Sequence, residues 1–165
     1  MEKLQIYIQL TRLNKPIGFM LLFWPCAWGL ALGYYFNQES KIFIEYLFLF
    51  FLGSVLMRSA GCIFNDIVDR DLDKKVKRTK NRPIASGKIS IFESLIYIIF
   101  LCFLALLILL QFNLLTIILG LGSMSLAFAY PFMKRITYWP QLFLGLTFNW
   151  GIVMAWSSLA NNISI

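Results

Sequence analysis

The sequence contains no histidine and has only three cysteines among its 165 residues. The absence of histidine excludes Ser-His-Asp and Cys-His catalysis, the HExxH zinc site and histidine-ligated haem or iron. Cys26, Cys62 and Cys102 lie in apolar stretches and form no CxxC pair. We therefore expect three reduced thiols that face a core or lipid, and not a disulfide-stapled secreted module.

Charge is also scarce, because only 14% of the residues are charged, against about 25% in soluble domains. Hydrophobic residues make up 59% of the chain, with 16 Phe among them, and the mean hydropathy is +0.72. This composition excludes a disordered chain. So much apolar surface needs lipid as its solvent, which predicts an integral membrane protein.

Five apolar stretches are long enough to cross about 30 Å of hydrocarbon. We therefore predict an all-α fold, a multi-span transmembrane helical bundle, with residues 1–165 in a single domain. The predicted spans lie near 16–36, 43–64, 92–111, 113–132 and 138–158. A polar loop, 65–90, separates the second span from the third, and Ser90 with Glu93 predicts a capping box where the third begins.

Basic residues are distributed unevenly over the segments between these spans. Three precede the first span, eight lie in loop 65–90 and two directly precede the fifth span. Because cytoplasmic loops carry an excess of Lys and Arg, this pattern predicts a cytoplasmic N-terminus and a cytoplasmic loop 65–90. The net charge of +7 is thus interpreted as a topology signal and not as a nucleic-acid-binding surface. No transit-peptide pattern is visible, so we expect the bacterial cell inner membrane.

Half of the eight acidic residues fall within positions 66–73. On a helix that turns 100° per residue, Asn65, Asp66, Asp69 and Asp73 share an arc of about 100°, whereas Asp71 falls on another side. Three carboxylates on one face repel each other by roughly 4 kcal/mol per pair at 4 Å and an effective dielectric near 20. We therefore expect a cation, and oxygen ligands without His or Cys favour Mg²⁺ or Mn²⁺. The alternative is a solvated loop whose acids pair with its own Lys and Arg.

A basic stretch, 77–82, follows the aspartates directly. Lys and Arg beside a divalent cation suit a diphosphate, although the same residues would also suit anionic lipid. Arg58 lies inside the second predicted span, where an arginine costs about 2.5–3.5 kcal/mol and is a functional candidate by default. The spacing thus predicts a membrane site for Mg²⁺ and a polyanion, and it leaves the reaction open.

Three stretches together carry a family resemblance. The pattern Asn65-Asp66-x-x-Asp69-x-x-x-Asp73, within AGCIFNDIVDRDLDKKVKRTKNRPIASG, resembles the first aspartate-rich motif of the UbiA superfamily of intramembrane prenyltransferases. The longer string is similar to the 4-hydroxybenzoate polyprenyltransferase branch. RLNKPIGFMLLFWP (12–25) and YPFMKRITYWPQLFLGLTFNWGI (130–152) point the same way, so the resemblance covers nearly the whole chain.

The resemblance implies a nine-helix bundle whose first five spans this chain would supply. It implies Mg²⁺-dependent transfer of a polyprenyl group from an allylic diphosphate to the ring of 4-hydroxybenzoate in ubiquinone biosynthesis. The implied partners are polyprenyl diphosphate, 4-hydroxybenzoate and the lipid bilayer, and no nucleic acid. The implied roles are Mg²⁺ binding for Asp66, Asp69 and Asp73 with Asn65 beside them, diphosphate binding for Lys77, Arg78, Arg82 and Lys134, and orientation of the acceptor or the first aspartates for Arg58.

The sequence departs from the family in one respect. The family carries a second aspartate-rich motif, whereas no acidic residue follows Glu93 here. Three hypotheses result. The chain is the N-terminal part of an enzyme that a C-terminal half completes, either covalently or as a separate polypeptide; or it is an inactive truncated remnant; or it is a non-catalytic membrane binder of polyprenyl diphosphate.

Overall fold

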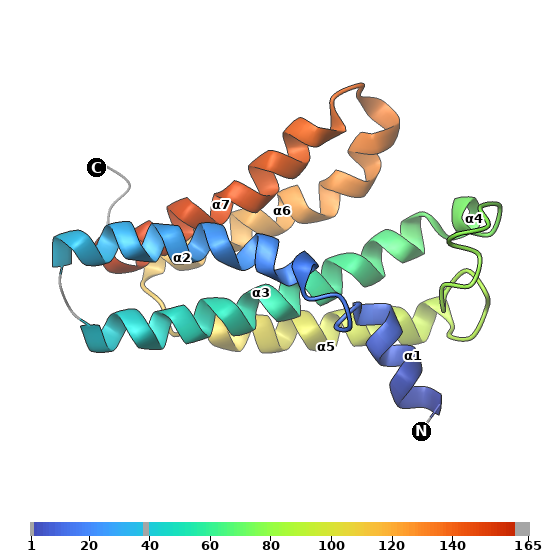
Figure 1. Cartoon of the computed structure of the whole chain (residues 1–165), viewed down its shortest axis with the longest axis horizontal. Coiled ribbons are helices and arrows are strands. Elements are labelled where there is room, and N and C mark those ends of the chain that lie inside the picture. The colour runs from blue at the N-terminus through green and yellow to red at the C-terminus, as the bar shows by residue number, and fades with distance from the viewer. Residues whose placement is uncertain (1, 38–39, 161–165) are drawn as a thin grey trace.

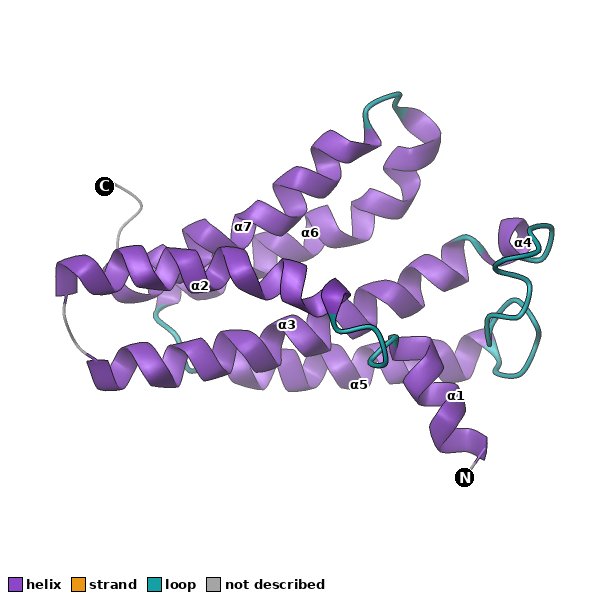
Figure 2. Ribbon diagram, viewed as in Figure 1, coloured by secondary structure: helices purple, strands orange, loops and turns teal. Residues whose placement is uncertain are grey.

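The computed structural model describes residues 2–37 and 40–160. Within these ranges the chain forms seven helices and no strand (Figure 1, Figure 2). The helices are α1 (Glu2–Thr11), α2 (Ile17–Asn37), α3 (Ser40–Val68), α4 (Arg70–Asp73), α5 (Ile91–Leu109), α6 (Leu114–Ile136) and α7 (Pro140–Ala160). The all-α prediction is confirmed.

Five of these helices, α2, α3, α5, α6 and α7, are long and apolar enough to cross a membrane, as the sequence predicts. The short helices α1 and α4 were not expected, because neither has the length or the apolar run of a span. The capping box at the start of α5 is present: the Ser90 side chain accepts from the backbone N–H of Glu93, whose carboxylate accepts from the backbone N–H of Ser90.

One side of α2 shows why the bundle needs lipid around it. Its exposed large side chains recur every three or four residues along the helix, at Ile17, Leu21, Trp24, Trp28, Leu32 and Tyr35. That spacing places them in one apolar stripe. Such a stripe, turned away from the core, would be unfavourable in water and is matched to hydrocarbon.

The long helices pack in pairs, and a glycine allows one of these pairs to pack closely. The helix α2 packs against α7 and α3, α3 packs against α5, and α6 pairs with α7. At Gly29 an added Cβ would lie 2.4 Å from the backbone oxygen of Ile152, so the backbones of α2 and α7 meet almost directly. In Figure 1, α6 and α7 form a hairpin that slants away from α3 and α5.

Two buried clusters hold the bundle together. The first joins α1, α3, α5 and the loop after α4, through Leu10, Ala60, Ile63, Ile84, Ile89, Ile98 and Leu101. The second joins α2, α3, α7 and the turn before α6, through Cys26, Leu30, Phe50, Phe112 and Ala155. Because Ile84 and Ile89 are anchored in the first cluster, the loop between α4 and α5 is part of the packed structure.

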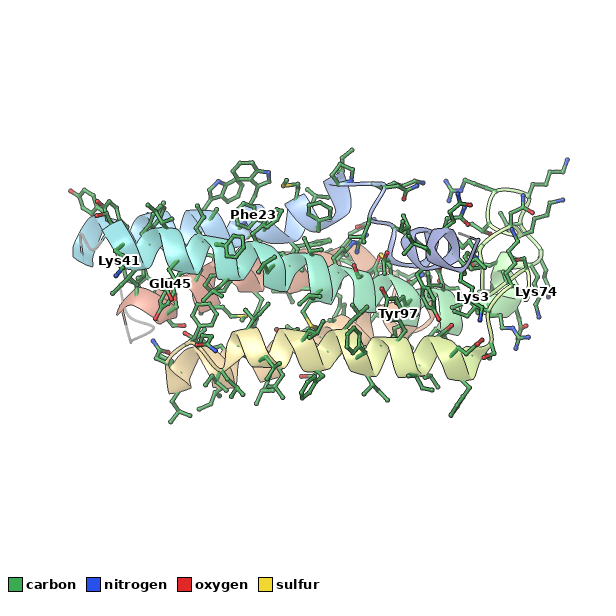
Figure 3. All side chains as sticks on the ribbon, turned by 90° about the horizontal axis from the view of Figure 1, so that it is seen from below. Lys3, Phe23, Lys41, Glu45, Lys74 and Tyr97 are labelled. Atoms are coloured by element: carbon green, nitrogen blue, oxygen red, sulfur yellow. The ribbon has the colours of Figure 1, made fainter. Side chains whose placement is uncertain are left out.

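The charged segments gather at one end of the bundle. In Figure 1, α1, α4 with its loop and the α6–α7 turn all lie toward the same end. Figure 3 shows Lys3 and Lys74 near that end and Lys41 with Glu45 near the other. The three segments that hold most of the basic residues are therefore on one side of the apolar helices.

Candidate functional site

A cavity of about 690 Å³ lies among α2, α3, α5, α6 and α7. One end of it is polar and charged, and is lined by Arg12, Asn65, Asp69, Asp73, Arg78 and Arg82. Farther along α3 the wall becomes apolar and aromatic, and it reaches Phe50 and Phe112. The cavity is therefore amphipathic along its length.

The backbone places three of the predicted site residues on this wall. The helix α3 ends at Val68, and α4 begins at Arg70. The backbone N–H of Asp69 still donates to the backbone oxygen of Asn65 at 2.9 Å. The backbone N–H of Asp73 donates to the backbone oxygen of Asp69 at 2.8 Å. Because this four-residue register continues across the break, Asn65, Asp69 and Asp73 all face the cavity.

Asp66 lies beside that wall, where two arginines hold its carboxylate. It is 2% exposed. Its Oδ1 accepts from Arg12 Nη2 at 2.5 Å and from Arg82 Nη1 at 3.1 Å. Arg82 Nη1 also donates to Oδ2 of Asp73, at 2.7 Å. The arginines offset the large cost of burying two ionised carboxylates, and Arg82 links the end of α3 to α4.

Arg12 is the site residue that sequence reasoning missed. It follows the last residue of α1 and adopts a left-handed backbone conformation, with φ of 55°, which is uncommon outside glycine. This turn directs its side chain to Asp66, 54 residues away. The sequence has one related signal: Arg12 opens the stretch RLNKPIGFMLLFWP, which carries part of the resemblance.

Arg58 lines the cavity from α3, within the membrane-spanning part of the helix. Its guanidinium carbon lies 5.9 Å from the centroid of the Phe148 ring, which is within cation–π range. The guanidinium also packs beside Gly18, where an added Cβ would lie 3.0 Å from Nε. The arginine thus has an aromatic face and a close-packed neighbour, and it lies toward the charged end of the cavity.

The remaining predicted basic residues differ in whether they line the cavity. Arg78 is exposed and lines the cavity. Among the residues that the structure describes, Lys77 is exposed and lies outside the cavity lining. Lys134 belongs to α6, but its side chain lies outside the described part of the chain.

Asp71 is distinct from the other aspartates, as its helical phase predicts. Its side chain is exposed, and Oδ1 accepts from Lys74 Nζ at 3.1 Å. This hydrogen bond and the positive charge of Lys74 lower the pKa of Asp71 below its ordinary value. Asp71 is therefore ionised at neutral pH while pointing away from the cavity.

The oxygen donors at the charged end fit a hard cation that takes some of its ligands from the protein and the others from water and phosphate. In the described residues, no three His, Cys, Asp or Glu side chains stand together as a complete metal-binding group. Asn65, Asp69 and Asp73, whose side chains carry oxygen donors, nevertheless line one wall of the cavity, and Oδ2 of Asp73 accepts from Arg82. Mg²⁺ is typically held by one or two carboxylates, with water and substrate phosphate completing its shell.

These features define a class of protein: a multi-span helical membrane protein whose cavity suits a ligand with an anionic head and an apolar body. Residues 22–165 match the profile of the UbiA prenyltransferase family. The chain belongs to this family.

Several curated relatives are similar over nearly the whole chain. A mitochondrial 4-hydroxybenzoate polyprenyltransferase of Homo sapiens is 51% identical over 158 residues, which are 94% of this chain and 42% of the relative. A 4-hydroxybenzoate octaprenyltransferase of Vibrio atlanticus is 47% identical over 161 residues, which are 98% and 55%. The mitochondrial protein of the same description from Drosophila melanogaster is 45% identical over 161 residues, which are 96% and 40%.

The chain thus spans about half the length of the curated relatives that it matches. No solved structure matches it.

Proposed function

We propose that this chain takes part in Mg²⁺-dependent transfer of a polyprenyl group from an allylic diphosphate to the ring of 4-hydroxybenzoate, in ubiquinone biosynthesis. One observation carries the proposal: the cavity joins an Asp- and Arg-lined end to an apolar wall along the membrane-spanning helices. A polyprenyl diphosphate has the same division between a charged head and an apolar chain. The relatives' descriptions support this donor and this acceptor.

In this proposal Asp66, Asp69 and Asp73, with Asn65 beside them, hold Mg²⁺ at the charged end of the cavity. The metal would neutralise charge on the departing diphosphate and so help the allylic C–O bond to ionise. The position of Asn65, Asp69 and Asp73 on the cavity wall supports this proposal. Two of the carboxylates are already paired with arginine: Asp66 with Arg12 and Arg82, and Asp73 with Arg82. Metal binding at Asp66 or Asp73 requires these pairings to change.

Basic side chains bind the rest of the diphosphate. Arg78 and Arg82 line the cavity beside the aspartates, and Lys77 and Lys134 are the further proposed contacts. Guanidinium groups bind phosphate oxygens in pairs of charge-assisted hydrogen bonds. The basic residues thereby stabilise the leaving group as its charge develops.

The apolar part of the cavity protects the reactive carbon. Packed Phe and Trp side chains exclude water, which would otherwise capture an allylic cation. Aromatic faces such as that of Phe148 stabilise a cation without bonding to it. Arg58, beside that ring, orients the anionic acceptor or the first aspartates. The acceptor ring then attacks the allylic carbon and loses its ring proton as the diphosphate leaves.

We further propose that the chain acts as the N-terminal part of the enzyme, together with a C-terminal half that is either covalent or a separate polypeptide. The chain's coverage of about half of each relative supports this proposal. The proposed location is the bacterial cell inner membrane, with the N-terminus in the cytoplasm. The gathering of the basic segments at one end of the bundle supports that orientation.

The test compares two aspartates of equal charge. Membranes that carry the chain are given a polyprenyl diphosphate, 4-hydroxybenzoate and Mg²⁺, with and without the C-terminal half of a relative, and prenylated product is measured. Asp69→Asn removes a carboxylate from the cavity wall and is expected to lower turnover roughly 100-fold or more. Asp71→Asn removes an exposed carboxylate of the same charge and is expected to leave turnover within about twofold.

Equal turnover in the two variants would contradict the metal assignment. Binding of the prenyl diphosphate without product, even in the presence of the C-terminal half, would instead favour the non-catalytic binder. Neither binding nor product would indicate an inactive remnant.

A further inference from the structure

A single guanidinium nitrogen links two carboxylates at the charged end of the cavity. Nη1 of Arg82 donates to Oδ1 of Asp66 at 3.1 Å and to Oδ2 of Asp73 at 2.7 Å. The Asp66 side chain is 2% exposed and the Asp73 side chain is 10% exposed, so water screens neither carboxylate well. Arg82 therefore places its positive charge at two of the carboxylates that are proposed to hold Mg²⁺.

The two carboxylates differ in what holds them besides Arg82. Oδ1 of Asp66 also accepts from Nη2 of Arg12, which comes from the turn after α1. In the part of the chain that the structure describes, Asp73 forms its ion pair with Arg82 alone. If Arg82 moves away, Asp66 thus keeps a paired cation, whereas Asp73 loses its own and requires another.

The backbone that carries Arg82 is fixed, but its side chain is partly open to the cavity. The backbone N–H of Arg82 donates to the oxygen of Thr79, and the oxygen of Arg82 accepts from the backbone N–H of Ser86, both at 2.9 Å. The Arg82 side chain is 26% exposed and lines the cavity beside Arg78. Arg82 can therefore change its partner by rotation of the side chain, without movement of the loop.

The two ligands of the proposed reaction have opposite effects on this arginine. A guanidinium that binds a carboxylate oxygen repels a second cation at the same oxygen. A diphosphate attracts the guanidinium, because phosphate oxygens match its paired N–H donors. The metal thus competes with Arg82 for Asp66 and Asp73, whereas the diphosphate competes with the two aspartates for Arg82.

We propose that Arg82 couples diphosphate binding to metal binding by exchanging its partners. Diphosphate draws the guanidinium away from Asp66 and Asp73 and so releases carboxylate oxygens for the metal, while Arg12 acts as a positioning residue that keeps Asp66 in place. The cation then binds weakly until the donor has arrived. The inference rests on the proposed function, since it assumes that these aspartates bind the metal and that the diphosphate lies at the charged end.

The first experiment measures the binding of each ligand alone, to the chain in lipid nanodiscs. Mn²⁺ is titrated without diphosphate and followed by electron paramagnetic resonance, and radiolabelled inorganic diphosphate is titrated in EDTA. Arg82→Gln is expected to bind Mn²⁺ roughly tenfold more tightly, because the competing cation is gone. It is expected to bind diphosphate roughly tenfold more weakly, because one charged contact is lost. A merely structural role for Arg82 would weaken the binding of both ligands.

Two variants show whether this pattern belongs to the ion pairs of Arg82. Arg78→Gln removes the same charge from the cavity wall, but Arg78 forms no ion pair within the described ranges. It is expected to weaken diphosphate binding and to leave Mn²⁺ affinity within about threefold, because a more distant charge is screened. Arg82→Lys restores the charge and is expected to return Mn²⁺ affinity to within about threefold of the parent chain.

A second experiment needs no substitution of Arg82, so it remains decisive if Arg82→Gln fails to fold. The chain is labelled with ¹³C at the aspartate carboxyl carbons, and inorganic diphosphate is added in EDTA. The Asp73 signal, identified by its loss in Asp73→Asn, is expected to shift as its ion pair opens. The Asp71 signal is the internal control and is expected to stay, because its partner Lys74 lies outside the cavity lining.

The outcomes separate this inference from the proposed function. If the parent chain does not bind Mn²⁺, or if Asp69→Asn leaves Mn²⁺ binding intact, the metal assignment is wrong and the partner exchange is wrong with it. If Asp69→Asn abolishes Mn²⁺ binding but Arg82→Gln does not tighten it, the exchange alone is wrong. A stationary Asp73 signal at saturating diphosphate would also overturn the exchange alone.

Discussion

Asp66 illustrates how a buried charge is made tolerable at the level of single side chains. A carboxylate that is 2% exposed is costly to ionise without partners. Here Arg12 comes from the turn after α1, and Arg82 comes from the loop after α4. Two segments that are remote in sequence thus bind the same oxygen atom. A substitution of either arginine therefore changes the ion pair that the other arginine makes with Asp66.

We predict that Arg12→Asn destabilises the chain through this pair. Asparagine tolerates the left-handed conformation of residue 12, so the substitution mainly removes the charge. We expect a loss of about 1–3 kcal/mol in unfolding free energy, because Asp66 keeps one of its two partners. The measurement is denaturant unfolding followed by tryptophan fluorescence in mixed micelles.

A double-mutant cycle provides the control. In the Asp66→Asn background, Arg12→Asn should cost at least about 1 kcal/mol less than in the parent chain if the two side chains interact. Equal costs in both backgrounds would show that Arg12 acts elsewhere.

At the scale of helices, the close crossing of α2 and α7 depends on small residues. A Cβ at Gly29 would lie 2.4 Å from the oxygen of Ile152 and 3.0 Å from Cβ of Ala155. At Gly151 an added Cβ would lie 2.6 Å from Sγ of Cys26. In a bilayer, where lipid tails are as apolar as the helices, such close backbone contact is a main source of helix association.

Gly29→Ala is therefore expected to destabilise the α2–α7 pair by about 1–3 kcal/mol, although alanine favours the helix itself. Gly122→Ala is the matched control, because its Cβ would meet no atom within 4 Å. That variant should be neutral or more stable by up to about 1 kcal/mol. The measurement is the melting temperature of the two variants side by side. Equal values would contradict the close crossing of α2 and α7 at Gly29.

The turn between α5 and α6 is stabilised by the side chain of Asn113, which caps α6 and also binds α7. Asn113 accepts from the backbone N–H of Thr116, as an N-cap, and donates to two backbone oxygens of α7. Asn113→Ala should cost about 1–3 kcal/mol of unfolding free energy, because it removes the cap and the tether together. Asn149→Ala, which removes one exposed bond to Gly145, is the control and should change stability by less than about 0.5 kcal/mol.

On the scale of the whole molecule, the arrangement gives the bundle two electrically different ends. Figure 3 shows Lys3 and Lys74 near one end and Lys41 near the other. The loop after α4 is packed through Ile84 and Ile89, so its basic residues are carried on an ordered scaffold at that end. The proposed orientation places this end in the cytoplasm.

Sidedness can be measured with single cysteines at exposed positions. Ser86→Cys lies in the loop after α4, and Gln111→Cys lies in the turn between α5 and α6. With a membrane-impermeant maleimide, we expect Gln111→Cys to react in intact spheroplasts and Ser86→Cys to react in inverted vesicles. The parent chain corrects for reaction at its native cysteines, and labelling of both positions from one side would contradict the topology.

The sequence predicts most strongly what depends on local composition. The five spans follow from long apolar runs, and the facing of Asn65, Asp69 and Asp73 follows from a helical repeat that persists across the break at Asp69. The short helix α1 was missed because its ten residues mix polar and apolar side chains and are too few to give a span signal. The Arg12–Asp66 contact was missed because it joins positions 54 residues apart through one unusual backbone angle.

The pairing of α2 with α7 has a consequence for the order of events during synthesis. The helices α2 and α7 are neighbours, yet more than a hundred residues separate Gly29 from Ile152. At translation rates of about 5–20 residues per second, roughly 6 to 25 seconds pass between the synthesis of α2 and the synthesis of α7. During that interval the glycine face of α2 is in contact with lipid, with the insertion machinery or with another helix, so the α2–α7 pair forms only after α7 has been synthesised.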